Sequence, residues 1–335
     1  MFQRRLPKTG QRGKTPSMQW LMPDSGKPKA ERRLQPLFRK LNIFSYLALG
    51  LGVLAVHCWL RSIPNRADSP DAVAAIRFEP VSIDPAGFAP LRLAGAWQVA
   101  VDDPRFGGIS ALAVDRGRLL ALTDSGTLAG FPRPGDAGRA ILCDLPAGPG
   151  SPRFKRHRDS EALARDPHGR GWWVAFEQSH QVWLYDPAFR RVLARIDLGR
   201  KRWRANRGIE AMVARGNQLR LFPESGRQWL AVSDGRVGSH RLSSRFGSVA
   251  DAVLLAEGRL LLVTRQAGVR GLAKRLVELG GDGRLRPLAR LDVGATGNVE
   301  AIAVEPSARG TRLWLMTDND FRPRAPTLLV ALDLP

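Results

Sequence analysis

From residue 91 onward, short apolar runs alternate with brief polar turns. The runs are flanked by Gly, Asp, Asn and Pro, as is typical of short β-strands joined by turns. No segment in this region has the periodicity of a helix long enough to connect parallel strands. The pattern therefore predicts an all-β domain built from hairpins. The clearest runs are Arg118–Leu122, Trp172–Phe176, Leu219–Phe222, Arg259–Val263 and Arg312–Met316.

A short phrase precedes each of these runs and sets the repeat. Its five versions are Gly108–Leu112, Arg158–Leu163, Gly208–Met212, Val249–Val253 and Asn298–Ile302. With Ser110, Glu161, Glu210, Asp251 and Glu300 taken as equivalent, the spacings are 51, 49, 41 and 49 residues. A unit of about 40 to 50 residues with four short strands is typical of a β-propeller blade.

The two ends of the repeat region complement each other. The last unit has only three clear strands, ending with Thr327–Leu332, while the strand Leu91–Val101 precedes the first unit without a partner. Pairing of the two would close the ring and remove an exposed edge. We therefore predict one domain of five blades over residues 91–335. The alternative is a sixth, divergent blade that uses residues 76–90.

An uncharged apolar stretch lies before the propeller, at residues 41–60 (LNIFSYLALGLGVLAVHCWL). Twenty helical residues cover the roughly 30 Å core of a bilayer. The stretch predicts one transmembrane helix, followed by a linker with a possible extra strand at residues 61–90. A cleavable signal peptide is the competing interpretation.

Charge gives the predicted helix a direction. Residues 1–41 contain eleven Lys or Arg and only Asp24 and Glu31 as acids. Basic residues favour the cytoplasmic side, so we expect a single-pass protein of the inner (cytoplasmic) membrane with a periplasmic or otherwise extracytoplasmic C-terminal domain. The polar composition of residues 1–40 predicts a disordered tail.

The whole chain carries a formal charge of +21, which raises the question of nucleic-acid binding. Only eight of its 52 basic residues are Lys, and five of these precede residue 41. The repeats are rich in Arg throughout and contain no basic run with interleaved aromatic residues. We therefore expect no nucleic-acid partner.

Each unit has two equivalent positions, and eight of these ten positions hold a carboxylate. The start of the first strand and the end of the second lie side by side in a hairpin, so the pairs should converge at one mouth of the central channel. The pairs are Ser110 with Asp124, Glu161 with Glu177, Glu210 with Glu224, Asp251 with Arg265, and Glu300 with Asp318. Crowded carboxylates repel one another unless cations compensate them, and oxygen ligands suit Ca²⁺. The eight acids are therefore candidate metal ligands.

A structural role is the alternative for the repeated acids. Each could accept backbone N–H groups of the neighbouring blade and fasten the two blades together, and some acids could fasten while others bind. Four basic groups lie at or beside the repeat and are candidates for binding a phosphate or carboxylate substrate, since guanidinium groups recognise both. They are His157, Arg158, Arg207 and Arg265.

The phrase G-[IV]-[ES]-A-[LM], together with T-D-S-G at Thr123–Gly126 and T-D-N-D at Thr317–Asp320, resembles the "esterase-like activity of phytase" (phytase-like domain) family. The resemblance covers about residues 95–334. It implies phosphoester chemistry on a propeller. The better-known calcium-dependent propeller phytases further imply a channel mouth lined with Ca²⁺.

Two functions from different classes remain open. The first is a metal-dependent phosphoesterase that holds Ca²⁺ at the channel mouth and acts on a phosphoester or another anionic small molecule. The second is a non-catalytic propeller that binds an envelope protein, a peptide or a polysaccharide. The chain has no G-x-S-x-G, H-E-x-x-H or Walker A motif, so none of these hydrolytic mechanisms is indicated.

Overall fold

The computed structural model describes residues 29–66, 69–199, 203, 207–268, 271–294, 297–308, 310–322 and 325–334. The chain forms two compact units, Met1–Ile63 and Pro64–Pro335, which are treated separately below. Most of the predicted tail, residues 1–28, lies outside the described residues.

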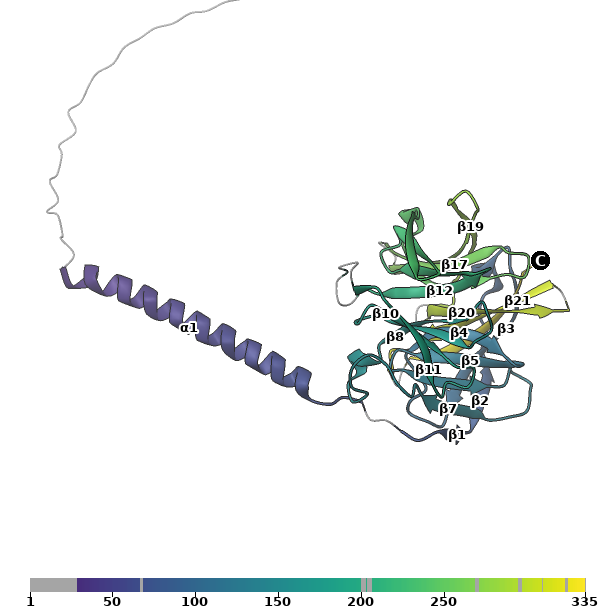
Figure 1. The fold of residues 1–335 in the computed structure, drawn as a ribbon, viewed down its shortest axis with the longest axis horizontal. Coiled ribbons are helices and arrows are strands. Elements are labelled where there is room, and N and C mark those ends of the chain that lie inside the picture. The colour runs from purple at the N-terminus through teal and green to yellow at the C-terminus, as the bar shows by residue number, and fades with distance from the viewer. Residues whose placement is uncertain are drawn as a thin grey trace, which may run out of the picture. The chain divides into compact units, whose positions relative to one another are not determined.

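The first unit contains one helix, α1 (Lys29–Ser62), which is longer than the predicted segment 41–60 (Figure 1). Residues 29–40 are helical and therefore differ from the disordered tail expected there. The stretch around Glu31 and Gln35 is rich in residues with good helix propensity, although its composition is polar. The side chains of residues 41, 42 and 44 in the predicted span lie outside the described set. Among the side chains that are described, no helix has the length and apolarity needed to cross a membrane.

The second unit is a propeller of five antiparallel sheets, which confirms the predicted fold (Figure 1). Blade 1 contains β4 (Ile109–Asp115), β5 (Arg118–Thr123), β6 (Thr127–Phe131), β7 (Ala140–Asp144) and β1 (Ala72–Ala74). Blade 2 contains β8 (Ser160–Arg165), β9 (Trp172–Phe176), β10 (Gln181–Tyr185) and β11 (Val192–Asp197). Blade 3 contains β12 (Ile209–Arg215), β13 (Gln218–Pro223), β14 (Gln228–Ser233) and β15 (Arg236–Arg241).

The remaining blades follow the same order from the inside outward. Blade 4 contains β16 (Ser248–Leu254), β17 (Leu260–Gly268), β18 (Gly271–Leu279) and β19 (Leu285–Arg290). Blade 5 contains β20 (Asn298–Ser307), β21 (Gly310–Asp318), β22 (Thr327–Leu334), β3 (Arg92–Val101) and β2 (Ile76–Pro80). Short 3-10 turns lie at Pro85–Phe88, Lys155–His157 and Ser244–Phe246.

The ring closes as the sequence predicted. Strand β3 pairs with β22 over the register Thr327↔Val99 to Asp333↔Arg92. The alternative of a sixth blade is wrong, because residues 76–80 form β2 at the outer edge of blade 5. Residues 72–74 likewise form β1, which pairs with β7 at the outer edge of blade 1. The stretch expected to be mostly linker therefore contributes one outer strand to each of the two blades that meet at the closure.

The core lies between the blades. Alternate residues of each strand face one neighbouring blade or the other, so every blade shares two apolar clusters with its neighbours. Leu119, Ala121 and Phe131 of blade 1, for example, share a cluster with Ala301 and Leu329 of blade 5. The innermost strands β4, β8, β12, β16 and β20 contact one another in sequence around the central channel.

Each innermost strand has a β-bulge at the same place. The register with the second strand skips one residue, which is Ser110, Glu161, Glu210, Ala250 or Glu300. A bulge leaves its extra residue out of the ladder and redirects the side chain. The repeated phrase in the sequence is therefore the signature of a bulge that turns one residue of each blade toward the channel.

Candidate active site

One mouth of the channel opens into a polar cavity of about 230 Å³. All five blades contribute to its wall through the bulge residue, the end of the second strand, or both. The lining residues are Gly108, Ile109, Ser110, Asp124, Glu161, Glu177, Glu210, Glu224, Ala250, Arg265, Asn298, Glu300, Asp318 and Asp320. The cavity thus brings together seven of the eight carboxylates that the sequence predicted, and adds Asp320.

Asp251 is the predicted acid that the structure does not place in the cavity. The bulge residue of blade 4 is Ala250, so the correct repeat spacings are 51, 49, 40 and 50 residues. Asp251 is 2% exposed, and its two carboxyl oxygens accept the backbone N–H groups of Ala252 and Ile302, each at 2.8 Å. Because Ile302 belongs to blade 5, Asp251 has the geometry of the blade-fastening alternative. The sequence alignment missed this because Asp251 lies one residue from the bulge.

Blade 4 supplies positive charge to the cavity instead. Arg265 contacts Glu300 at 3.1 Å and both Glu210 and Glu224 at 3.4 Å. Buried Lys274 lies 2.9 Å from Glu300 and also donates to the backbone oxygen of Val299. Burial lowers the pKa of Lys274, whereas the three carboxylates outweigh burial and raise the pKa of Arg265. This side of the cavity carries its own cations.

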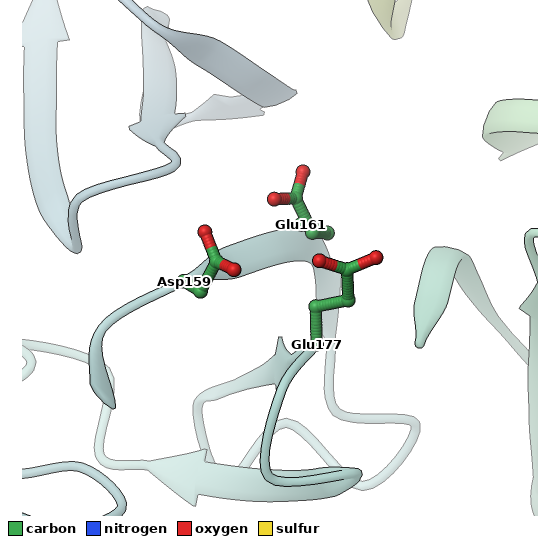
Figure 2. Close-up of side chains that lie close together, drawn as sticks. All are labelled: Asp159, Glu161 and Glu177. Atoms are coloured by element: carbon green, nitrogen blue, oxygen red, sulfur yellow. The ribbon is translucent and has the colours of Figure 1, made fainter. Parts of the chain in front are cut away.

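Blade 2 brings three carboxylates together: Asp159, Glu161 and Glu177 (Figure 2). Asp159 immediately precedes β8, Glu161 is its second residue, and Glu177 follows β9. One oxygen from each lies within 4.8 Å of the others. Burial raises the pKa of Glu161 well above its usual range, and Glu210 and Asp159 add to the effect. Burial and Asp159 raise the pKa of Glu177 to about 7.

A second group of carboxylates shares Glu177 with the first. Its members are Glu177, Glu210 and Glu224, and one oxygen from each lies within 4.8 Å of the others. Burial raises the pKa of Glu210 to about 8 despite the opposing charge of Arg265, with help from Glu177 and Glu300. Glu210 therefore holds a proton at neutral pH in the absence of a metal ion.

Blades 1 and 5 complete the acidic wall. Asp124 accepts a hydrogen bond from the Lys155 ammonium at 2.7 Å, and Lys155 also lies 3.6 Å from Asp159. Burial raises the pKa of Asp124, although Lys155 opposes this. Burial and a hydrogen bond with Asp320 raise the pKa of Asp318 to about 7.

The five bulged phrases and the residues that line the acidic cavity all lie in the part of the chain that matches a known family. The family model described as "Phytase-like: Esterase-like activity of phytase" matches residues 104–321. The chain belongs to the phytase-like family. The resemblance predicted from the G-[IV]-[ES]-A-[LM] phrase is therefore confirmed.

Solved structures similar to the phytase-like chain are distant. Glutaminyl cyclase from Myxococcus xanthus is 12% identical, with a TM-score of 0.49 over 73% of this chain and 97% of that one. A protein of unknown function from Bacteroides thetaiotaomicron is 11% identical, with a TM-score of 0.44 over 82% of this chain and 73% of that one. A search of curated proteins found no match.

The predicted substrate-binding residues of the phytase-like domain lie in different places. Only Arg265 lines the cavity, where three carboxylates contact its guanidinium group. Arg158 is 2% exposed and donates to the backbone oxygens of Pro149 and His157. His157 accepts a hydrogen bond from the backbone N–H of Ser151 through Nδ1. The exposed Arg207 lies 3.8 Å from Glu224 and lines a neighbouring hollow of about 330 Å³ with Trp203.

Sequence reasoning missed Asp159, Lys155, Lys274 and Asp320. The repeat carried a signal for Asp159: two residues before the bulge, the other blades have Gly108, Gly208, Ser248 and Asn298. An acid at that position is specific to blade 2. Lys274 lies on the third strand of its blade, where no repeat links it to the channel.

The blade 2 carboxylates are suitable ligands for a hard cation. Ca²⁺ prefers six to eight oxygen ligands at about 2.3–2.6 Å and tolerates flexible geometry. Asp159, Glu161 and Glu177 can supply several of these oxygens, and water would supply the rest. The Lys155 ammonium lies 3.6 Å from Asp159, at one edge of this group. A bound cation would also offset the burial and the repulsion that raise the pKa values of Glu161 and Glu177.

Proposed function

We propose that this phytase-like propeller is a Ca²⁺-dependent hydrolase of phosphoric esters that acts at the acidic mouth of its channel. The observation that carries the proposal is the cluster of Asp159, Glu161 and Glu177, whose oxygens lie within 4.8 Å of one another. Membership of a family named for esterase-like activity supports the choice of reaction.

In this proposal, Asp159, Glu161 and Glu177 hold the metal ion. When bound, the ion would polarise a phosphoryl oxygen and lower the pKa of a water molecule. Glu210, which lies close to Glu177, would act as the acid that gives a proton to the leaving group. Arg265 keeps Glu210 and Glu224 in position through its two 3.4 Å contacts. Arg207, exposed beside Glu224, is the group available to contact the rest of an anionic substrate.

Charge sets a condition on the substrate. Eight carboxylates line the cavity against Arg265, with Lys155 and Lys274 in contact with two of them. An anionic ester would be repelled by this excess of negative charge, so we expect phosphate binding only after a cation has bound. Ester hydrolysis and Ca²⁺ binding should therefore appear together and disappear together.

The test is an assay of the purified full chain on generic phosphomonoesters and phosphodiesters, with Ca²⁺ and with chelator. We expect hydrolysis only with Ca²⁺, and loss of at least about a hundredfold in Glu161→Gln. Glu257→Gln, an acid half-exposed in a turn of blade 4, is the matched control and should retain activity. Ca²⁺ binding without hydrolysis of either ester class would instead favour the non-catalytic binding propeller.

We also propose that α1 anchors the domain in a membrane, with residues 61–335 outside the cytoplasm. The apolar side chains at six positions between residues 47 and 56 are all more than half exposed, and at about 100° per residue these positions fall on two opposite faces of the helix. Such a surface is costly in water and is suited to lipid. The test is a reporter fused after Pro335. Activity of an export-dependent reporter is expected, and activity of a cytoplasm-dependent reporter alone would contradict the orientation.

A further inference from the structure

Lys155 places an ammonium group against the acidic cavity. Its Nζ lies 2.7 Å from Asp124 Oδ2 and 3.6 Å from Asp159 Oδ1. Asp124 lines the cavity, and Asp159 is one of the three proposed metal ligands. The side chain of Lys155 is still 39% exposed, so these two contacts alone would not fix a long, flexible side chain.

The backbone of Lys155 is held by residues far away in the sequence. Its N–H donates to Asn65 Oδ1 at 2.9 Å. The backbone N–H groups of Asn65 and Arg66 both donate to the carbonyl oxygen of Arg153, each at 3.1 Å. The short segment Pro64–Arg66, which we call the brace, thus fixes the turn that carries Lys155.

The side chain of Arg66 ties this turn to the one that carries Asp124. Its Nε donates to the carbonyl oxygen of Ser125 at 2.8 Å, and its Nη1 donates to that of Pro152 at 3.0 Å. Its Nη2 lies 2.9 Å from Asp144, and the Arg66 side chain is only 7% exposed. One buried guanidinium therefore joins the two chain segments whose side chains form the ion pair at the cavity. Planar, multidentate donation of this kind is specific to arginine.

We propose that Asn65 and Arg66 are positioning residues that hold Lys155 in the acidic cavity as an internal cation. Only Ile63 separates the brace from α1 in the chain, and through these contacts the brace supports the site rather than acting as a simple linker. One part of this proposal rests on the proposed function. If Ca²⁺ binds at the blade 2 carboxylates, the Lys155 ammonium competes with it for Asp124 and Asp159.

The contact itself can be tested with a carbodiimide, which joins an amine and a carboxylate only when they touch. In the full chain, we expect mass spectrometry to find a Lys155–Asp124 cross-link. Arg66→Gln and Asn65→Ala should each lower its yield by about fivefold, in keeping with the modest strength of a partly exposed ion pair. Arg77→Gln, which breaks the similar but exposed pair with Asp102, is the control and should leave the yield unchanged. Asn65→Ala removes only the oxygen that accepts the Lys155 backbone N–H. If the buried Arg66 variant does not fold, the cross-link yield of Asn65→Ala tests the proposal.

Ca²⁺ titration of the same proteins separates the two proposals. Lys155→Met should raise the affinity for Ca²⁺ by about fivefold, since the internal competitor is gone. If the parent binds no Ca²⁺ but the cross-link responds as expected, the brace stands and the proposed function fails. Equal cross-link yields in the parent, Asn65→Ala and a folded Arg66→Gln would overturn the brace, whatever Ca²⁺ does.

Discussion

Blades 2 and 4 have the same backbone at the channel but opposite chemistry. At the position two residues before the bulge, at the bulge, and at the end of the second strand, blade 2 has Asp159, Glu161 and Glu177. Blade 4 has Ser248, Ala250 and Arg265 at the equivalent positions. Every blade therefore offers three positions whose direction the bulge fixes, and the residue type at each position sets the local charge.

The contrast divides the cavity into two functional sides. Around blade 4, Arg265 and Lys274 already neutralise Glu300 and its neighbours, so little remains for an external cation to do. Around blade 2, the carboxylates face one another and burial raises the pKa values of Glu161 and Glu177. We therefore expect substitutions in blade 4 to act on stability and substitutions in blade 2 to act on cation binding.

The largest effect should come from removing the cation of blade 4. Arg265→Met leaves Glu210, Glu224 and Glu300 without their shared partner, which should lower the free energy of unfolding by roughly 3 kcal/mol. Denaturant unfolding with chelator present measures the loss. Adding Glu224→Gln should recover part of it, because one of the carboxylates that lost Arg265 is then neutral. A loss below about 1 kcal/mol would show that solvent already screens this side of the cavity.

The next effect concerns blade 2 and depends on metal. At a hundredfold excess over Kd, Ca²⁺ should stabilise the parent by roughly 2.7 kcal/mol. Glu161→Gln should lose most of this gain, yet with chelator it should be at least as stable as the parent, since one of several repelling carboxylates is gone. Thermal melts of both proteins, each with chelator and with Ca²⁺, make the comparison. A loss of stability in the variant that Ca²⁺ does not alter would mean that Glu161 is structural.

Asp251 should behave as a fastener and not as a ligand. Asp251→Asn replaces one of the two acceptor oxygens that bind the N–H groups of Ala252 and Ile302, so we expect a loss of about 2 kcal/mol. The loss should be the same with Ca²⁺ and with chelator, in contrast to Glu161→Gln. A loss of stability that differs between Ca²⁺ and chelator would instead indicate that Asp251 is a metal ligand.

The effect of pH is the smallest of the four when it is taken over a single pH unit. Carboxyl groups in an unfolded chain ionise near pH 4, whereas the pKa of Glu210 is raised to about 8 and that of Glu177 to about 7. Between these limits the folded state binds more protons than the unfolded state. The stability of the metal-free protein should therefore fall as pH rises from about 5 to 8, by about 1 kcal/mol per pH unit for Glu210. Melts across this range should show a weaker slope in Glu210→Gln, and stability that rises with pH would contradict the raised pKa values.

The sequence was sufficient to predict the architecture because propellers repeat. Alternating apolar runs and turns identified the blades, and the complementary ends of the repeat predicted the pairing of β3 with β22. It also predicted seven of the carboxylates around the cavity, since hairpin geometry places the two ends of each inner pair at one mouth.

The remaining features depend on contacts that the sequence pattern does not encode. A shift of one residue separates Ala250 from Asp251, and only the register of the bulge reveals which of them faces the channel. Lys155 and Arg66 reach the site from irregular segments with no repeat to align. The outer strands β1 and β2 are short, and pairing with β7 and β3 stabilises them more than their own apolar pattern does.

The closure of the ring has a consequence for biosynthesis. Strand β3 is made early, but its partner β22 (Thr327–Leu334) follows it by more than 200 residues. Since chains emerge from the ribosome N-terminus first, the edge of β3 that faces β22 stays unpaired until blades 1 to 4 have been made, while β2 can cover its other edge. During that interval its edge is open to pairing with other chains. Synthesis of β22 therefore ends the period in which this edge can promote aggregation.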